Sequence, residues 1–122
     1  MEKNDNWLNY KIEIRDKLKL FSLRILEVSK TLSGSPRLNV VNYQLTKSGT
    51  SVYANYRAAM RARSKAEFYS KLSISVEEAD ETEMWIDLII GSKMMESKEI
   101  KDLYEESLSL VKILASMRKR LG

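Results

Sequence analysis

The 122-residue sequence contains no cysteine and no histidine. The absence of cysteine excludes disulfides, thiolate metal sites and cysteine nucleophiles, and it is typical of a protein that works in the reducing cytoplasm. The absence of histidine removes the usual zinc ligand, the commonest general base and the partner of every serine–histidine nucleophile. We therefore expect a cytoplasmic protein that is not an enzyme, with no catalytic residues, no metal site and no cofactor.

Residues that interrupt helices are also scarce, since the chain has one proline and four glycines. A charged fraction of 31% beside a hydrophobic fraction of 43% describes a globular chain, and the length suits one domain over residues 1–122. The N-terminus is too polar for a signal peptide, and the most apolar stretch, 84–90, is too short to cross a bilayer. We expect a helical domain without a membrane segment.

The first helix is predicted from apolar residues at every third or fourth position, which keep one helix face apolar. This stripe comprises Ile14, Leu18, Phe21, Ile25, Val28 and Leu32. Residues 1–13 are expected either to extend the helix backwards through Trp7 and Tyr10 or to form a loosely ordered N-terminal extension. Gly34, a suitable left-handed C-cap, and Pro36 predict where the helix ends.

A second helix is predicted from about Arg37. Its stripe comprises Leu38, Val41, Leu45, Ser48, Val52, Tyr56 and Ala59. The middle of this segment, Ser-Gly-Thr-Ser at 48–51, has poor helix propensity, so a loop between two short helices is the alternative. A phosphate-binding loop is disfavoured because the P-loop spacing and a preceding strand are both missing. Because the period continues across the segment, and small residues let a neighbouring helix approach closely, we expect one helix.

A third helix is predicted to start at the capping-box pattern of Ser64 and Glu67. Its stripe comprises Phe68, Leu72, Val76, Ala79, Glu83, Ile86 and Ile90, and the helix is expected to end near Gly91. Because Glu83 falls on the stripe, we expect this carboxylate to be buried with a partner. The candidate partners are Ser48, Ser51 and Asn55 of the second helix, or an arginine.

The fourth helix is predicted to begin near Ser97, a good N-cap. Its stripe comprises Ile100, Leu103, Ser107, Leu110, Leu114, Met117 and Leu121. Four helices joined by short connections pack as antiparallel neighbours. The predicted fold is therefore an all-α, antiparallel up-and-down four-helix bundle.

Charge is distributed unevenly along this chain. Residues 77–106 carry eleven acidic and three basic side chains, whereas the rest carries eighteen basic and six acidic ones. In the predicted topology, basic residues from the ends of the second and fourth helices share one pole with the starts of the other two. The predicted nucleic-acid-binding residues at this pole are Arg57, Arg61, Arg63, Lys65, Arg118, Lys119 and Arg120. Complementation of helix dipoles explains only part of this clustering.

Further residues of the same pole have two interpretations. Early helix one adds the basic residues Lys11, Arg15, Lys17 and Lys19. Tyr53 and Tyr56 precede the arginine cluster, where tyrosines either stack on bases or belong to the core. Their position in a helical stripe favours the core.

The acidic run at 77–83 also has two interpretations. Helix bundles house di-metal sites between facing glutamates, but those sites need a Glu-x-x-His pairing that this chain cannot supply. A solvated acidic face, or a contact between subunits, is therefore favoured. The acids of late helix three and early helix four are expected at the pole opposite the basic one.

The segment 84–90 is apolar nearly all round, interrupted only by Asp87. A bundle helix buries one face, so a second apolar face needs another cover. We expect Trp85 and Ile89 to lie at an interface between subunits. The alternative is that the N-terminal residues around Trp7 fold over this face.

Three stretches carry a resemblance to a known family. They are QLTKSGTSVYANYR at 44–57, RARSKAEFYSKL at 61–72 and EADETEMWIDLI at 78–89. Over roughly residues 12–121, the chain resembles the four-helix bundle protein family, also called the 23S ribosomal RNA intervening-sequence protein family. It departs from the family pattern at Tyr53, where a glycine is common, and at 58–60, where an acidic residue often follows the arginine.

The resemblance implies an up-and-down bundle that assembles into a homopentameric ring and has no catalytic residues. Members are often encoded within insertions in ribosomal RNA genes. A relative is the accessory protein of diversity-generating retroelements, which binds nucleic acid and a reverse transcriptase. We therefore expect a homo-oligomer that binds RNA or DNA with little sequence specificity, with a reverse transcriptase as a candidate protein partner. The alternative is a structural or adaptor oligomer whose acidic pole docks a basic protein.

Overall fold

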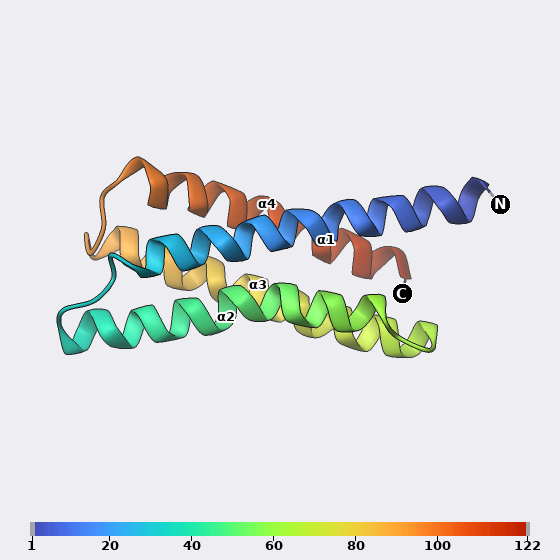
Figure 1. The fold of residues 1–122 in the computed structure, drawn as a ribbon, viewed down its shortest axis with the longest axis horizontal. Coiled ribbons are helices and arrows are strands. Elements are labelled where there is room, and N and C mark those ends of the chain that lie inside the picture. Colours follow the sequence, from blue (N-terminus) through green and yellow to red (C-terminus); the bar gives the residue numbers. More distant parts are fainter. Residues whose placement is uncertain (1, 122) are drawn as a thin grey trace.

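The computed structural model describes residues 2–121, with side chains from Asn6 onwards, as four long helices. They are α1 (Glu2–Ser29), α2 (Pro36–Met60), α3 (Lys65–Gly91) and α4 (Lys98–Leu121). The helices run along the long axis of the molecule, and successive helices point in opposite directions (Figure 1). The described residues contain no strand, so the predicted all-α up-and-down bundle is confirmed. Met1 and Gly122 lie outside the described residues.

The helix connections divide between the two ends of the bundle. The α2–α3 turn lies at the same end as the start of α1 and the end of α4 (Figure 1). We call this the turn end, and the opposite end, with the α1–α2 and α3–α4 connections, the loop end. Each helix packs on its neighbours in sequence and α1 also packs on α4. Among the described residues, the diagonal pairs α1–α3 and α2–α4 make no close backbone contact. The outer faces of α1 and α3 therefore lie on opposite sides of the bundle.

One continuous apolar core fills the space between the helices. The stripe predicted for the first helix is buried throughout. The largest fully buried side chains are Tyr56, Phe21, Ile14, Leu18, Ile25, Leu32, Leu45, Leu72, Ile86, Ile89, Ile100 and Leu114. Burial of one large apolar side chain contributes about 1.5–3 kcal/mol, so these residues supply much of the force that holds the helices together.

α1 ends earlier than the sequence predicts. Its start at Glu2 agrees with the alternative in which the helix extends backwards through Trp7 and Tyr10. The helix ends at Ser29, and the next three N–H groups bond to carbonyls three residues back. Gly34 has a φ of 110°, but it lies in the connection to α2. The predicted C-cap was wrong because Leu32, the last residue of the stripe, reaches the core from the turn and not from the helix.

α2 is one unbroken helix, as predicted, and Ser35 caps its start by accepting a hydrogen bond from the N–H three residues on. Its small residues lie at the contact with α3. Ser48 is fully buried and accepts a hydrogen bond from Thr82 at 3.0 Å, and Ser75 donates to the Val52 carbonyl at 2.8 Å. These bonds satisfy hydroxyls that are buried where α2 and α3 pack together most extensively.

Gly49 sets the distance between α2 and α1. A Cβ atom at this position would lie 2.9–3.1 Å from three side-chain carbons of Ile25. Ile25 is fully buried and branched at Cβ, so it has little freedom to move aside. The helix therefore needs a glycine here despite the poor helix propensity of this residue.

We predict that Gly49→Ala lowers the free energy of unfolding. Alanine favours the helix by about 1 kcal/mol, but overpacking a core costs about 1–3 kcal/mol, so a net loss of about 1 kcal/mol is expected. Urea unfolding followed by circular dichroism measures the change. In an Ile25→Ala background the space is free, and Gly49→Ala should stabilise the protein. Equal destabilisation in both backgrounds would contradict the steric explanation.

Serines cap α3 and α4 at the predicted positions. Ser64 accepts a hydrogen bond from the Glu67 N–H at 3.1 Å, and Ser97 accepts one from the Ile100 N–H at 3.3 Å. Each bond satisfies one of the N–H groups that have no partner within the first turn of a helix.

The buried face of α3 departs from the predicted stripe at several positions. Ser75, Thr82 and Ile89 are buried, whereas Phe68, Glu83 and Ile90 of the predicted stripe are only half-buried. Thr82 is buried, and its hydroxyl lies within hydrogen-bond distance of the Ser48 hydroxyl and the Glu78 carbonyl. Glu83 is only half-buried and lies near Tyr104 of α4. The predicted burial of Glu83 and its bonds to α2 were wrong, because the neutral threonine occupies the α2 contact, where a carboxylate would be costly to bury.

Candidate nucleic-acid interface

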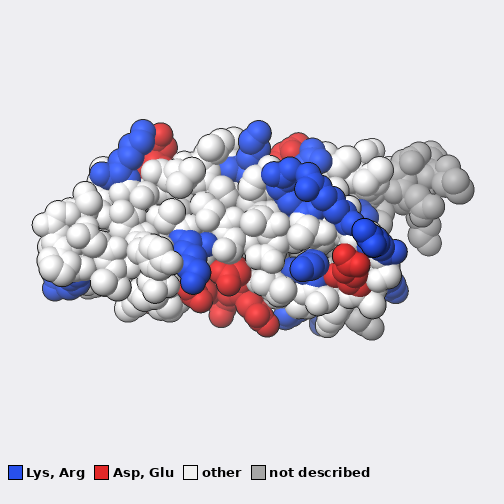
Figure 2. Space-filling view, turned by 60° about the horizontal axis from the view of Figure 1, so that its bottom comes forward, with Lys and Arg blue, Asp and Glu red and all other residues white. Residues whose placement is uncertain are grey.

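Basic side chains gather at the turn end of the bundle. Figure 2 shows lysine and arginine atoms spread over one face towards this end, with smaller groups of acidic atoms beside and between them. The predicted binding residues that meet here are Arg57, Arg61, Arg63, Lys65, Arg118, Lys119 and Arg120. Arg118 is half-buried and the other six are exposed. None of the seven forms a salt bridge with a side chain in the described range 6–121.

Arg57 and Arg61 face α1 across a groove with a volume of about 490 Å³. The residues that line this α1–α2 groove are Arg15, Asp16, Lys19, Tyr53, Arg57, Met60 and Arg61. The Arg57 guanidinium lies over the ring of Tyr53, with 5.6 Å between its carbon and the ring centroid, which is a cation–π distance. The groove therefore combines positive charge with an aromatic ring.

The predicted basic residues share one end of the bundle, but they divide into two groups that do not line the same hollow. Arg57 and Arg61 line the α1–α2 groove, whereas Lys65 lines a shallow hollow together with Leu121 at the end of α4. The hollow connects the start of α3 to the basic last turn of α4. A ligand longer than the groove can thus contact both groups.

Aromatic rings at the start of α1 hold some of the positive charges. Arg120 lies over Trp7, with 4.5 Å between the guanidinium carbon and the ring centroid. The Lys11 ammonium lies 5.5 Å from the centroid of Trp7 and 5.1 Å from that of Phe68. Trp7 also stacks on Tyr10 at a centroid distance of 6.0 Å. These contacts tie α1 to α3 and α4, so Arg120 also has a structural role.

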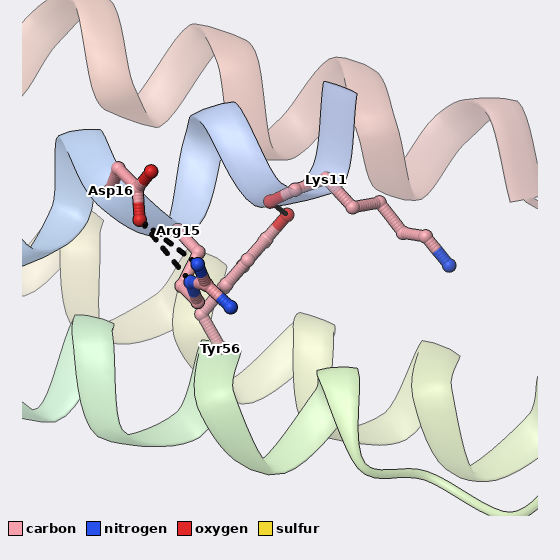
Figure 3. Close-up of polar contacts among 4 residues, drawn as sticks. All are labelled: Lys11, Arg15, Asp16 and Tyr56. Atoms are coloured by element: carbon pink, nitrogen blue, oxygen red, sulfur yellow. Dashed lines mark hydrogen bonds and ion pairs between the residues drawn. The ribbon is translucent and has the colours of Figure 1, made fainter. Parts of the chain in front are cut away.

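The two tyrosines near the arginines differ in exposure. Tyr56 is fully buried, and its hydroxyl reaches across to α1, where it donates to the Lys11 carbonyl at 2.7 Å (Figure 3). Burial raises the pKa of this hydroxyl well above its usual range, although the positive charge of Arg15 opposes the shift. Tyr53 is half-buried and lines the groove. The core interpretation is thus confirmed for Tyr56, whereas Tyr53 has a ring that a ligand can reach.

We predict that Tyr56→Phe lowers the free energy of unfolding by about 1 kcal/mol near neutral pH, the typical contribution of one hydrogen bond. Above about pH 10 the unfolded chain releases the tyrosine proton while the folded protein retains it. The stability of the wild type should then fall by up to about 1.4 kcal/mol per pH unit from this group. The variant lacks the group, so its deficit should disappear towards about pH 11. Urea unfolding at several pH values measures the difference, and a constant deficit would contradict the assignment.

The predicted subunit interface on α3 needs correction. Ile89 is 0% exposed in the single chain and belongs to the core, so it is not available to another subunit. Trp85 is half-buried against the same core, and its indole N–H donates to the Glu81 carboxylate at 3.2 Å. The exposed large apolar residues of this segment are Met84 and Leu88. The alternative cover is also wrong, because the start of α1 lies at the turn end (Figure 1).

The outer face of α1 carries a second apolar stripe that the predicted core stripe does not include. Leu20, Leu23 and Leu26 follow one another at steps of three residues, and each is about half exposed. Arg15 and Lys19 were predicted only to lie at the basic pole, and the structure places them in the groove opposite α2. In the sequence, the spacing of the leucines was the signal for the outer stripe. The antiparallel order of the helices was the signal for the position of Arg15 and Lys19.

The acidic run at 77–83 lies midway along α3 and not at either end. Asp87 and the acids of the α3–α4 connection and of the start of α4 lie nearer the loop end. Burial, followed by the charge of Glu81, raises the pKa of the Glu78 carboxyl. Within residues 6–121, no three acidic side chains are grouped so as to hold one metal ion. None of the described helices combines the length and the apolar character that crossing a membrane requires.

Comparison with known proteins places the bundle in a family. Residues 10–116 match the family described as 23S rRNA-intervening sequence protein. The chain is also similar to a protein of unknown function from the S23 ribosomal protein family of Bacteroides thetaiotaomicron VPI-5482. That crystal structure has a TM-score of 0.80 and 35% sequence identity, over 87% of this chain and 98% of the other. No curated protein matches the sequence. The extent of the family match shows that this chain belongs to the 23S rRNA-intervening sequence protein family.

Proposed function

We propose that this protein binds RNA or DNA through its basic turn end and catalyses no reaction. The observation that carries the proposal is the convergence of seven basic side chains on one end of the bundle, without a salt-bridge partner among the described side chains. The matched family takes its name from intervening sequences of 23S ribosomal RNA, which supports RNA as the first ligand to test.

A purely structural role explains only part of this charge. Arg57 and the basic run 118–120 lie in the last turns of α2 and α4, where positive charge complements the helix dipole. Lys65 is the first residue of α3, where the dipole favours negative charge. Arg61 is the C-cap residue of α2, where positive charge also complements the dipole, whereas Arg63 lies between the helices. Binding of phosphate groups accounts for the basic residues that dipole complementation leaves unexplained.

The chemistry of this end fits contact with phosphates. Arginine and lysine side chains bind phosphate oxygens and release condensed counterions, so affinity falls as salt concentration rises. Phosphate contacts carry no sequence information by themselves. We therefore expect binding with little sequence preference.

We further propose that the protein assembles into a homo-oligomeric ring. A cyclic ring needs two different surfaces on each subunit, one for each neighbour. The leucine stripe on the outer face of α1 and the pair Met84 and Leu88 on α3 supply two exposed apolar surfaces on opposite sides of the bundle. The family resemblance implies five subunits. A ring would present several basic ends to one nucleic acid, so weak contacts by single subunits would add up.

The test is a fluorescence-anisotropy titration of the purified protein against short RNA and DNA, single-stranded and duplex, at low and high salt. The proposal expects saturable binding whose affinity falls steeply with salt. Absence of binding at low salt, or binding that is indifferent to salt, would overturn it.

A further inference from the structure

We propose that the α1–α2 groove is a subsite for one unpaired nucleotide of a single-stranded nucleic acid. In this subsite the base stacks on Tyr53, and the adjacent phosphates are held by basic residues of both helices. The inference rests on the proposed nucleic-acid binding and adds that the bound nucleic acid is single-stranded at this site. It also gives a role to Tyr53, which binding through phosphates alone would not require.

The charges of the groove favour a polyanion. Four of the lining side chains are basic and one is acidic. The acidic residue, Asp16, pairs with Arg15 at 3.2 Å, and the two side chains are 64% and 39% exposed (Figure 3). Ion pairs this exposed contribute only about 0–1 kcal/mol to stability, so Arg15 can exchange the carboxylate for a phosphate at little cost.

The aromatic ring in the groove is already anchored. Tyr53 packs against the core with one part of its ring, so a stacking ligand needs to immobilise little of this side chain. The exposed Arg57 guanidinium covers one face of the ring at 5.6 Å, so an unpaired base stacks on this guanidinium plane or, once the guanidinium moves aside, on the ring itself. The arrangement therefore offers a stacking platform bordered by positive charge.

The size of the groove limits the ligand. A volume of about 490 Å³ lies within the range of sites for single small ligands. In a duplex the base faces are covered by neighbouring base pairs, so a duplex reaches the same residues only through its phosphates. An unpaired nucleotide can place its base against Tyr53 and its phosphates against Arg15, Lys19 and Arg61. Stacking is tolerant of sequence because every base has an aromatic face.

The test compares Tyr53→Ala and Tyr53→Phe with the wild type on three ligands: a single strand, the same strand with abasic residues, and a duplex. Tyr53→Ala loses one base–aromatic stack, so it should bind the single strand about tenfold more weakly than the wild type does. The duplex and the abasic strand should lose less than about twofold, because their phosphates are unchanged. Tyr53→Phe keeps the ring and should bind all three ligands like the wild type.

Tyr43→Ala is the matched control. Tyr43 also lies on α2 and has an ammonium, that of Lys47, 5.9 Å from its ring centroid, but it does not line the groove. This variant should retain wild-type affinity, and all variants should first show wild-type helicity and thermal stability. Equal losses of Tyr53→Ala on the three ligands, or no loss, would overturn the subsite and leave the proposed phosphate binding intact. A wild type that binds none of the ligands would overturn both proposals.

Discussion

Reversal of three charges at the turn end, in Arg57→Glu/Arg61→Glu/Arg63→Glu, should abolish most binding of RNA and DNA. If one subunit engages about four phosphates, the wild-type affinity for duplex DNA should fall on the order of a hundredfold between roughly 50 and 200 mM salt. The variant loses three of these contacts and gains three carboxylates that repel phosphate. We expect at least an approximately hundredfold weaker affinity at low salt, with a smaller dependence on salt. Fluorescence anisotropy measures both quantities.

The matched control is Arg37→Glu/Lys93→Glu/Lys101→Glu, which changes the net charge equally at the loop end. All three residues are exposed and form no salt bridge among the described side chains. This variant should bind within a few-fold of the wild type, because screening weakens charges beyond about 10 Å. Equal losses in both variants would assign binding to net charge alone. Wild-type affinity in the turn-end variant would favour the adaptor hypothesis, with the acidic side of α3 and α4 as the functional surface.

The sequence predicted the fold well because helix periodicity and capping are local signals. The stripe of α1 and the caps Ser64 and Ser97 depend on residues a few positions apart. The errors arose where a residue has two nearly equivalent neighbours on a helix. After Ala79, a step of three residues leads to Thr82 and a step of four leads to Glu83, and both positions fit a helical stripe. Only the packing against Ser48 decides that Thr82 is the buried residue.

The predicted basic residues lie at one end of the bundle, as the sequence indicated, but two basic residues that line the α1–α2 groove were not among the predicted binding residues. The antiparallel topology was enough to bring Arg57 and the end of α4 to one end. To predict that Arg15 and Lys19 lie opposite α2, one needs the register between α1 and α2, which the contact of Gly49 with α1 helps to set. Such a register depends on side chains from both helices, so the pattern of one helix does not reveal it.

The same limitation explains the error at Ile89. The segment 84–90 is apolar on two faces, and hydrophobicity alone does not say which face the bundle buries. The structure buries Ile89 and leaves Leu88 about half exposed. On α1, the leucine stripe was assigned no role because the stronger stripe already accounted for a core-facing helix. Exposed leucines on both helices are the surfaces that a ring assembly would use.

Disruption of either apolar surface should therefore dissociate the proposed ring. In a head-to-tail ring, the α1 leucines of one subunit pack on Met84 and Leu88 of the next, so each subunit uses both surfaces. Light scattering of the wild type should give the mass of about five chains, the number that the family resemblance implies. Leu23→Lys and Leu88→Lys should each give the mass of one 14.1 kDa chain, with helicity unchanged because both side chains are about half exposed.

A mixture of the two lysine variants tests the head-to-tail arrangement itself. The Leu23→Lys subunit keeps an intact α3 surface, and the Leu88→Lys subunit keeps an intact α1 surface. One unaltered interface can therefore form between them, and the mixture should contain particles of two chains, which neither variant forms alone. Both introduced residues are positively charged, so they cannot create a new ion pair.

A monomeric wild type at tens of micromolar would rule out the ring, and a Leu23→Lys variant that keeps the wild-type mass would exclude α1 from the interface. A mixture that stays monomeric would point to a symmetric contact, in which each surface packs on its own copy.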